Sequence, residues 1–405
     1  MKVTDFTRYS RVAAAIDDLN ASCKNKEYSD IIDARGRQYV DLVMEGGGVL
    51  GIALVGYTYA LEQAGIRFLG VGGTSAGAIN ALLLAGLGKP EEPKSIKTLN
   101  ILADLNINRF VDGDTDAVDF CEALVERSGI AKIMWKGWQV LDNISDDLGL
   151  NPGQAFFDWL AESLSRAGVN TVAGLKKQMV PPELMTRTGN KIAKRDYGAR
   201  LALVAADITT ETKVVFPDMA DLYWRNHNTV NPANFVRASM SVPMFFHPFR
   251  VSGIPNDDRA KKRWDDKASY RGEIPAEVLF VDGGIMSNFP IDLFHAPGVP
   301  TAPTFGAKLG VDRSKPTTIT KIAQLGGAVF DAARHCADYD FLIRNRDYRK
   351  LVTFIQTGDH HWLNFFMTND EKKDLFALGV EAGVKFLKEF NWQKYKEIRA
   401  ANTQG

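Results

Sequence analysis

Apolar and polar positions along residues 38–88 form blocks that predict strands and helices in turn. Gln38 to Met44 is a β-branched and apolar run typical of a strand, and Val49 to Ala64 has the pattern of a helix that ends at Gly65. Ile66 to Val71 indicates a second strand, and Ala76 to Leu87 indicates a second helix. Because a glycine-rich turn follows each strand, this repetition predicts an α/β fold.

The remaining chain has a less regular pattern. Residues 91–195 are mostly helical in character, and Leu201 to Ala206 is a continuous apolar run typical of a buried strand. Val278 to Val281 predicts a short strand, and Asp370 to Phe390 predicts a long helix. Asn256 to Lys267 mixes charges of both signs, which favours a solvated loop.

No linker, internal repeat or low-complexity tract divides the chain convincingly, so we expect one domain with a helical insertion. We predict a partly helical lead-in over residues 1–36, a main domain over 37–390 with an insertion at about 91–195, and a tail over 391–405. The first residues contain no apolar core of a secretory signal, which favours the cytoplasm. Export by a route without such a peptide stays open.

One segment has the length of a membrane span. Leu69 to Gly88 is 20 residues without a charge, about the length that crosses a bilayer as a helix. The sequence Gly72-Gly73-Thr74-Ser75 would break such a helix, and lipid could not satisfy the freed backbone groups. A buried strand, a tight turn and a buried helix therefore fit better.

Composition excludes several classes of protein. The 405 residues hold 49 Lys and Arg and 49 Asp and Glu, so there is no positive excess for binding nucleic acid by bulk charge. Cys23, Cys121 and Cys336 are far apart and form no C-x-x-C pair, which argues against a disulfide framework and a zinc site. His360 and His361 are adjacent, and adjacent side chains rarely share one face, so we expect no metal there.

Gly73 to Gly77 has the sequence G-T-S-A-G, a G-x-S-x-G pentapeptide between a predicted strand and a predicted helix. On such a sharp turn the serine hydroxyl is exposed, and the N-terminus of the next helix favours developing negative charge. Gly73 and Gly77 would let neighbouring backbone pass without a Cβ clash. Ser75 is therefore a candidate nucleophile. The alternative is a glycine turn that serves only close packing.

Gly46-Gly47-Gly48 opens the first predicted helix in a similar way. Successive backbone N–H groups at such a turn can bind a phosphate or the oxyanion of a tetrahedral intermediate. Gly46, Gly48 and Gly51 also match the dinucleotide pattern G-x-G-x-x-G, but no acidic residue stands about 20 residues further on, near Gly70. Two glycine turns on neighbouring strands, one with a serine, favour acyl transfer over nucleotide binding.

A nucleophilic serine needs a base. None of the six histidines stands in an obvious loop after a late strand, whereas Asp282 follows an apolar run and precedes Gly283 and Gly284. A carboxylate there would lie at the carboxyl edge of the sheet, where we also place the Ser75 turn. It could act as a base if a dry site raised its pKa toward the working range. An Asp-Gly turn without chemistry is equally compatible with the pattern.

Three motifs in fixed order resemble the signature blocks of the patatin-like phospholipases: GGGVLG at Gly46 to Gly51, GTSAG at Gly73 to Gly77, and DGG at Asp282 to Gly284. Two supporting blocks, LVAADITT from Leu203 and RASMSVPMFFHP from Arg237, are similar to the family in the same order. The resemblance covers roughly residues 38–390. It implies a three-layer α/β/α fold with a mixed central sheet, related to α/β-hydrolases.

The resemblance also implies a Ser–Asp dyad, in which Ser75 accepts the acyl group and Asp282 is its base. The N–H groups of Gly46 to Gly48, with Ala76 as a further candidate, would form the oxyanion hole. The family cleaves acyl esters of phospholipids and lysophospholipids without a metal or an organic cofactor. We therefore expect a phospholipid or lysophospholipid substrate, transient contact with a membrane surface, and no cofactor; an unidentified activator stays open.

Two residues depart from the family pattern. Leu50 stands where the family usually has Arg or Lys, and Glu45 replaces the more common Asp before the glycines. A cation at position 50 could steady the oxyanion loop or a lipid phosphate, so its absence leaves rate and headgroup preference open. The leading hypothesis is a lipid acyl hydrolase of the phospholipase A or lysophospholipase type. An acyltransferase with the same dyad and a catalytically weak lipid-binding regulator are the alternatives.

Trp135 and Trp138 lie three residues apart in an apolar segment. Tryptophan suits the level of lipid headgroups, so this segment could be a lid or an interfacial surface. A three-residue spacing is also ordinary helix periodicity, and we favour a buried helix.

Overall fold

The computed structural model describes residues 1–103, 105–113, 148–192, 200–310, 316, 318–320 and 322–402. Trp135 and Trp138 lie outside these ranges, so the choice between a lid and a core helix stays a prediction.

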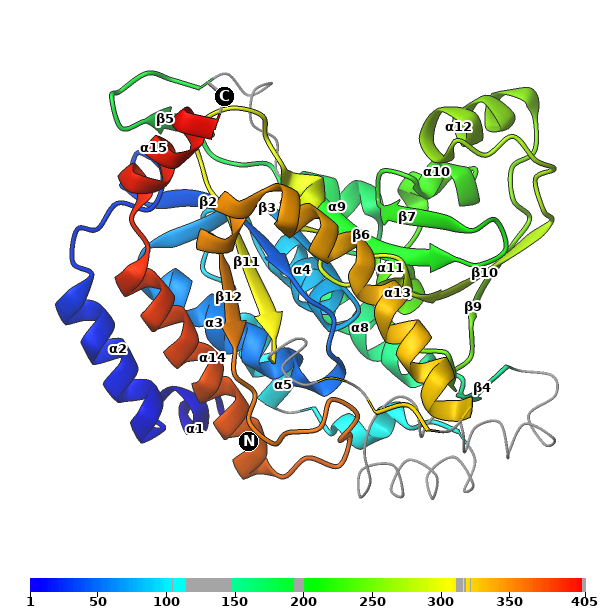
Figure 1. Cartoon of the computed structure of the whole chain (residues 1–405), viewed down its shortest axis with the longest axis horizontal. Helices are drawn as coiled ribbons and strands as arrows, with labels where there is room; N and C mark the ends of the chain where they lie inside the picture. Colours follow the sequence, from blue (N-terminus) through cyan, green and yellow to red (C-terminus); the bar gives the residue numbers. More distant parts are fainter. Residues whose placement is uncertain are drawn as a thin grey trace.

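A mixed β-sheet forms the centre of the described structure (Figure 1). Its main path has the order β12-β11-β2-β3-β6-β10-β9, and β1, β5 and β7 pair beside it. The bounds of these strands are β1 Ile31–Asp33, β2 Gln38–Met44, β3 Ile66–Thr74, β5 Leu184–Thr186, β6 Arg200–Asp207, β7 Thr212–Phe216, β9 Phe249–Ser252, β10 Glu277–Asp282, β11 Thr304–Leu309 and β12 Val352–Ile355. A separate pair joins β4 (Gly149–Asn151) to β8 (Met244–Phe246).

Strand direction changes within the sheet. From β12 through β11, β2 and β3 to β6, neighbouring strands run parallel. Strand β10 pairs with the same edge of β6 as β3, at the next positions along it, and runs antiparallel to β6, while β7 pairs with the other edge. Strand β9 runs antiparallel to β10. The sheet is therefore mixed, as the resemblance implies, and its central parallel strands are buried on both faces.

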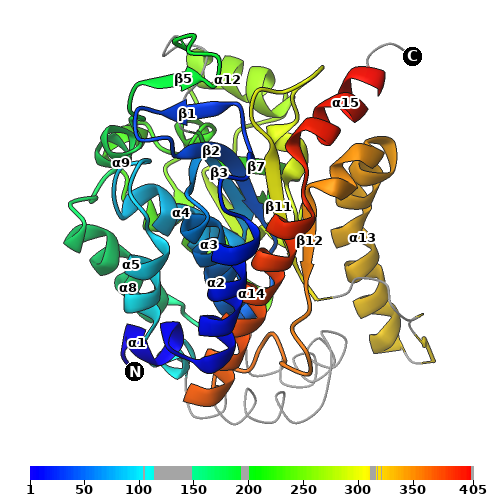
Figure 2. The ribbon, with the colours of Figure 1, turned by 90° about the vertical axis from the view of Figure 1, so that its left-hand side faces the viewer.

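Helices cover both faces of the sheet. On one face α3 (Gly51–Gln63) and α4 (Ala76–Gly86) pack against the strands, and α14 (Asn369–Glu389) packs on α3. On the opposite side lies α13 (Ile322–Arg344) (Figures 1 and 2). These layers make the α/β/α architecture. The other helices are α1 Val3–Thr7, α2 Ser10–Ser22, α5 Ser95–Ala103, α8 Gln154–Arg166, α9 Val172–Gln178, α10 Ala220–Tyr223, α11 Ala233–Ser239, α12 Asp258–Ala268 and α15 Trp392–Asn402.

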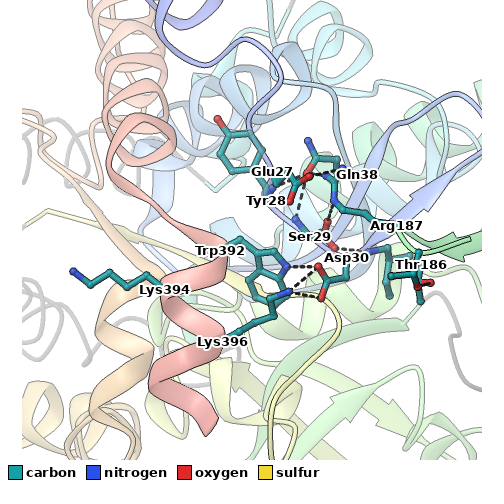
Figure 3. A network of polar contacts seen from close by, with 12 residues as sticks. Glu27, Tyr28, Ser29, Asp30, Gln38, Thr186, Arg187, Trp392, Lys394 and Lys396 are labelled. Atoms are coloured by element: carbon teal, nitrogen blue, oxygen red, sulfur yellow. Dashed lines mark hydrogen bonds and ion pairs between the residues drawn. The ribbon is translucent and has the colours of Figure 1, made fainter. Parts of the chain in front are cut away.

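The C-terminal segment is folded onto the N-terminal part of the chain through α15 (Figure 3). The carboxylate of Asp30 accepts a hydrogen bond from Trp392 Nε1 at 2.8 Å and pairs with Lys396 Nζ at 2.9 Å. Next to it, Arg187 Nη2 donates to Gln38 Oε1 at 2.6 Å. This polar cluster joins segments that are up to 366 residues apart in the sequence.

The predicted strand over residues 38–44 is confirmed residue for residue, and the predicted helices after both glycine turns are present. The first of them begins at Gly51, after the short 3-10 turn Gly48–Leu50. Residues 69–88 contain the end of β3, a turn and α4. None of the helices in the described parts of the chain combines the length and apolar character needed to cross a bilayer.

The prediction of a solvated loop over residues 256–267 is wrong, because α12 occupies most of this segment. The Asp257 side chain caps the helix by accepting a hydrogen bond from Ala260 N at 2.9 Å. Ala260 and Trp264, four residues apart, are both completely buried. One buried edge is enough to hold a helix whose other positions are charged.

Candidate active site

Ser75 occupies the turn between β3 and α4 with the backbone angles φ 51° and ψ −117°. A non-glycine residue rarely adopts this conformation, and it is typical of a serine on a sharp strand-to-helix turn. The turn places Ser75 at the N-terminus of α4, where the helix dipole favours negative charge. The Ser75 side chain is largely buried, at 7% exposure, but lines an apolar pocket.

The glycines around Ser75 are required by close backbone contacts. A Cβ atom added to Gly77 would lie 2.1 Å from the carbonyl oxygen of Met44, at the end of β2. A Cβ atom added to Gly73 would lie 2.4 Å from the carbonyl carbon of Gly77. Side chains at either position would therefore separate β2, β3 and α4, as the motif predicts.

Asp282 reaches Ser75 by a route that differs from the sequence prediction. We expected the carboxyl ends of both strands to meet at one edge, but β10 runs antiparallel to β6. Asp282 pairs with Ala205, whereas Thr74 of β3 pairs with the neighbouring Val204. The two residues therefore meet because β3 and β10 pair with the same edge of β6 and run toward each other, so that their carboxyl ends face each other at Val204 and Ala205.

The Ser75 hydroxyl lies close to the Asp282 carboxylate and favours its charged form. Burial raises the pKa of Asp282 above its usual range, while the Ser75 hydroxyl, the positive charge of Arg334 and the Gly284 N–H group act in the opposite direction. The Gly284 N–H group lies 2.7 Å from Asp282 Oδ1. The pair thus joins a hydroxyl to a desolvated carboxylate of raised proton affinity.

Two serines, one at the end of α11 and one just after it, hold the backbone of both residues. Ser239 Oγ accepts a hydrogen bond from Ser75 N at 2.9 Å, and the Ser241 carbonyl accepts one from Asp282 N at 2.8 Å. Thr74 Oγ1 also donates to the Ser287 carbonyl at 2.8 Å, which joins the two turns directly. The motifs predicted no role for these serines, although Ser239 and Ser241 lie in the supporting block that begins at Arg237.

The glycine loop after β2 lies beside Ser75. A Cβ atom on Gly46 would be 3.2 Å from Ser75 Cβ, and Gly48 lines the same pocket as Ser75. The Gly46 N–H group donates to the Asn288 carbonyl at 3.1 Å, so it is engaged, contrary to its expected place in the oxyanion hole. The N–H groups of Gly47 and Gly48 make no hydrogen bond to another described residue.

The two departures from the family pattern have different surroundings. Leu50 is buried in the apolar core. Glu45 is buried as well, and its carboxylate pairs with Lys308 Nζ at 2.6 Å and accepts a hydrogen bond from Leu309 N at 2.8 Å. A buried ion pair with further hydrogen bonds fixes the direction in which the chain enters the glycine loop.

An apolar pocket opens beside Ser75 and encloses about 760 Å³ of empty space, including its mouth. Apart from Ser75 and Asn80, the described lining residues are glycine or apolar, among them Ile79, Leu83, Leu105, Phe110, Phe156, Met240 and Trp362. Ala76, Ile79 and Leu83 follow one face of α4 at helical spacing, so the pocket extends along that helix from Ser75. Its lining can hold a hydrocarbon chain but offers few hydrogen-bonding groups to a polar chain.

In the described ranges, no group of three His, Cys, Asp or Glu side chains is placed so that it could hold a metal ion. His360 instead contacts the Asp374 carboxylate at 2.8 Å. Burial lowers the pKa of His361.

A model of the family described as patatin-like phospholipase matches residues 42–295. An uncharacterized protein of Bacillus subtilis, YqhO, is 28% identical over 356 residues, which are 87% of this chain and 100% of that protein. A stretch of 46 residues is 56% identical to lysophospholipase nte1 of Aspergillus terreus, and covers 11% of this chain and 3% of that enzyme. The crystal structure of VipD from Legionella pneumophila is similar at a TM-score of 0.42 and 16% identity, over 89% of this chain and 70% of that one.

The family match spans the glycine loop, the serine turn and the aspartate turn described above, and it includes more than half of the sequence. This chain therefore belongs to the patatin-like phospholipase family.

Proposed function

We propose that this protein is a lipid acyl hydrolase of the phospholipase A or lysophospholipase type, which cleaves carboxylic esters of phospholipids. The meeting of the Ser75 and Asp282 turns beside an apolar pocket is the observation that supports this most directly. Membership of the patatin-like phospholipase family supports lipid hydrolysis in general.

In the first half of the reaction Ser75 Oγ attacks the ester carbonyl carbon, and its proton passes to Asp282. The carbonyl oxygen becomes an oxyanion, which the N–H groups of Gly47 and Gly48 and the N-terminus of α4 stabilise. The intermediate then collapses to an acyl-enzyme. The departing alcohol, a lysophospholipid or glycerophosphodiester, takes the proton from Asp282.

In the second half a water molecule attacks the acyl-enzyme while Asp282 accepts one of its protons. Collapse of this second intermediate breaks the bond to Ser75 Oγ, which recovers a proton from Asp282, and the fatty acid leaves. The chemistry needs one carboxylate in two roles. A carboxylate whose pKa is raised by burial suits both, since it accepts a proton more readily than an exposed one and, with a pKa nearer the working pH, can still return it.

Product analysis tests the proposal. The protein is incubated with vesicles of mixed phospholipids, with and without a short alcohol, and the products are identified by mass spectrometry. We expect free fatty acid and the matching lysophospholipid in both samples. Acyl esters of the alcohol in place of fatty acid would identify an acyltransferase, and no product together with no labelling of Ser75 by a fluorophosphonate would identify a binding protein.

The pocket beside Ser75 predicts a preference for long acyl chains that depends on Leu83. Leu83 is completely buried and lies eight residues after Ser75, about 12 Å further along α4. We expect Leu83→Trp to fill this part of the pocket and to lower kcat/KM for a C16 ester relative to a C4 ester by about tenfold or more. The measurement is hydrolysis of p-nitrophenyl esters from C4 to C16.

Leu83→Met is the matched control, because it conserves volume and flexibility in an apolar site. It should retain the wild-type order of chain lengths. An unchanged C16 to C4 ratio in a folded Leu83→Trp variant would show that the acyl chain lies elsewhere.

A further inference from the structure

Arg334 brings a positive charge to the dyad from the opposite layer of the molecule. It lies on α13, which contacts the 3-10 turn Gly283–Ile285 that follows Asp282. Its Nε atom would lie 3.4 Å from a Cβ atom added to Gly284, so the guanidinium packs directly against this turn. The same Nε atom is buried and has no hydrogen-bond partner among the described residues.

The guanidinium also contacts the glycine loop. Arg334 Nη2 donates to the carbonyl oxygen of Gly46 at 3.3 Å, and Asn288 Nδ2 donates to the same oxygen at 3.3 Å. The C=O of Gly46 and the N–H of Gly47 belong to one planar trans peptide and point in opposite directions. Donors that fix the carbonyl on one side therefore fix the Gly47 N–H on the other side.

The same charge acts on the base. Arg334 lowers the pKa of Asp282, against the effect of burial, and so favours its ionised form. A cation here therefore has two consequences for the reaction. It orients an oxyanion donor, and it keeps the carboxylate able to accept a proton.

The other described cations near β10 are directed elsewhere. Arg237 on α11 donates to backbone carbonyls and to Ser241, and Lys308 on β11 pairs with Glu45. Arg250 on β9 pairs with Glu277, at the other end of β10.

Several acids and a histidine also lie on the elements around Asp282. On α13, burial raises the pKa of Asp331 while Arg334 lowers it, and burial raises that of Asp338 while Lys308 lowers it. The His335 ring contacts the ring of Tyr339 at a tilted angle. Asp207 on β6 accepts hydrogen bonds from Thr210 and Tyr223.

We propose that Arg334 is a positioning residue for the proposed hydrolase, which holds the oxyanion loop through Gly46 and the base through its charge on Asp282. The inference rests on the proposed function. It assigns to α13, which sequence motifs did not single out, a part in the chemistry. It also supplies a cation to a loop in which Leu50 has none.

The test compares wild type with Arg334→Gln and Arg334→Lys in fatty-acid release, across a range of pH, with melting temperatures to verify folding. We expect Arg334→Gln to lower kcat by about tenfold or more with little change in KM, because the lost contacts are not with the substrate. The fall in its activity on acidification, the acid limb of the pH–rate profile, should move to higher pH. This is because removal of the cation raises the proton affinity of Asp282. Arg334→Lys keeps the positive charge but lacks the planar guanidinium group with its several donors. Its acid limb should therefore be closer to that of wild type than its kcat is.

Arg344→Gln is the control, since Arg344 lies on the same helix, is largely exposed and pairs only with Asp340 among the described residues. It should leave kcat and the pH profile unchanged. If wild type is active and Arg334→Gln has the same kcat and the same acid limb, this inference is overturned while the proposed function stands. If Arg334→Gln does not fold, a folded Arg334→Lys with wild-type kcat would overturn it. A wild type that neither releases fatty acid nor labels at Ser75 would overturn the proposed function and this inference together.

Discussion

Replacing Ser75 with alanine is expected to abolish fatty-acid release, with a loss of about a thousandfold or more in kcat. The variant lacks the atom that forms the acyl-enzyme, and the remaining oxyanion donors cannot replace it. The fold should survive, because alanine keeps the Cβ atom and the backbone hydrogen bond from position 75 to Ser239. The measurements are fatty-acid release, fluorophosphonate labelling and melting temperature.

Ser22→Ala serves as the control for this experiment. Ser22 is exposed at the end of α2, where its hydroxyl contacts only Asp18 among the described residues. Activity and labelling of this variant should equal those of wild type. Full turnover by a folded Ser75→Ala variant would refute the acyl-enzyme mechanism.

Asp282→Asn is expected to lower kcat by about a thousandfold to ten-thousandfold. The amide has the shape of the carboxylate but cannot accept the Ser75 proton. In wild type, burial raises the pKa of Asp282, so activity should fall on acidification at a pH above the ordinary value of an aspartate, about 3.9. Below that pKa the carboxyl group is protonated and cannot act as a base. The pH dependence of kcat/KM measures this acid limb, which Asp282→Asn should lack.

Asp265→Asn is the matched control, because Asp265 forms a surface ion pair with Arg271 on the outer side of α12. It should preserve both the rate and the acid limb. If a folded Asp282→Asn variant kept more than about a tenth of the wild-type kcat, the result would contradict the role of Asp282 as base.

The two glycine turns and the central strands were predictable because their signals are local. β2 and β3 are rich in apolar and β-branched residues, which suits strands buried on both faces, and each leads into a glycine-containing turn before the next helix. The same local chemistry selects Ser75 among all serines of the chain. Asp282 was found for a similar reason, as an acid between an apolar run and two glycines.

Strand direction and distant contacts were not predictable from these patterns. An apolar run has the same composition in either direction, so nothing local marks β10 as antiparallel to β6. The contact between Arg334 and the carbonyl of Gly46 joins residues that are 288 positions apart, and no spacing rule connects them. The charged surface of α12 concealed its buried edge, although Ala260 and Trp264 had the required spacing.

The antiparallel entry of β10 makes the proposed dyad dependent on one strand pairing. The β6–β10 ladder sets Asp282 opposite Ala205, and a shift by a single residue would turn the carboxylate to the other face of the sheet. Beyond β10 the main path of the sheet, in the described part of the chain, continues only to β9, at its edge. Local opening at this edge would therefore separate base from nucleophile while the serine turn stays intact. A loss of hydrolytic rate would then detect the opening of this sheet edge before the protein unfolds globally.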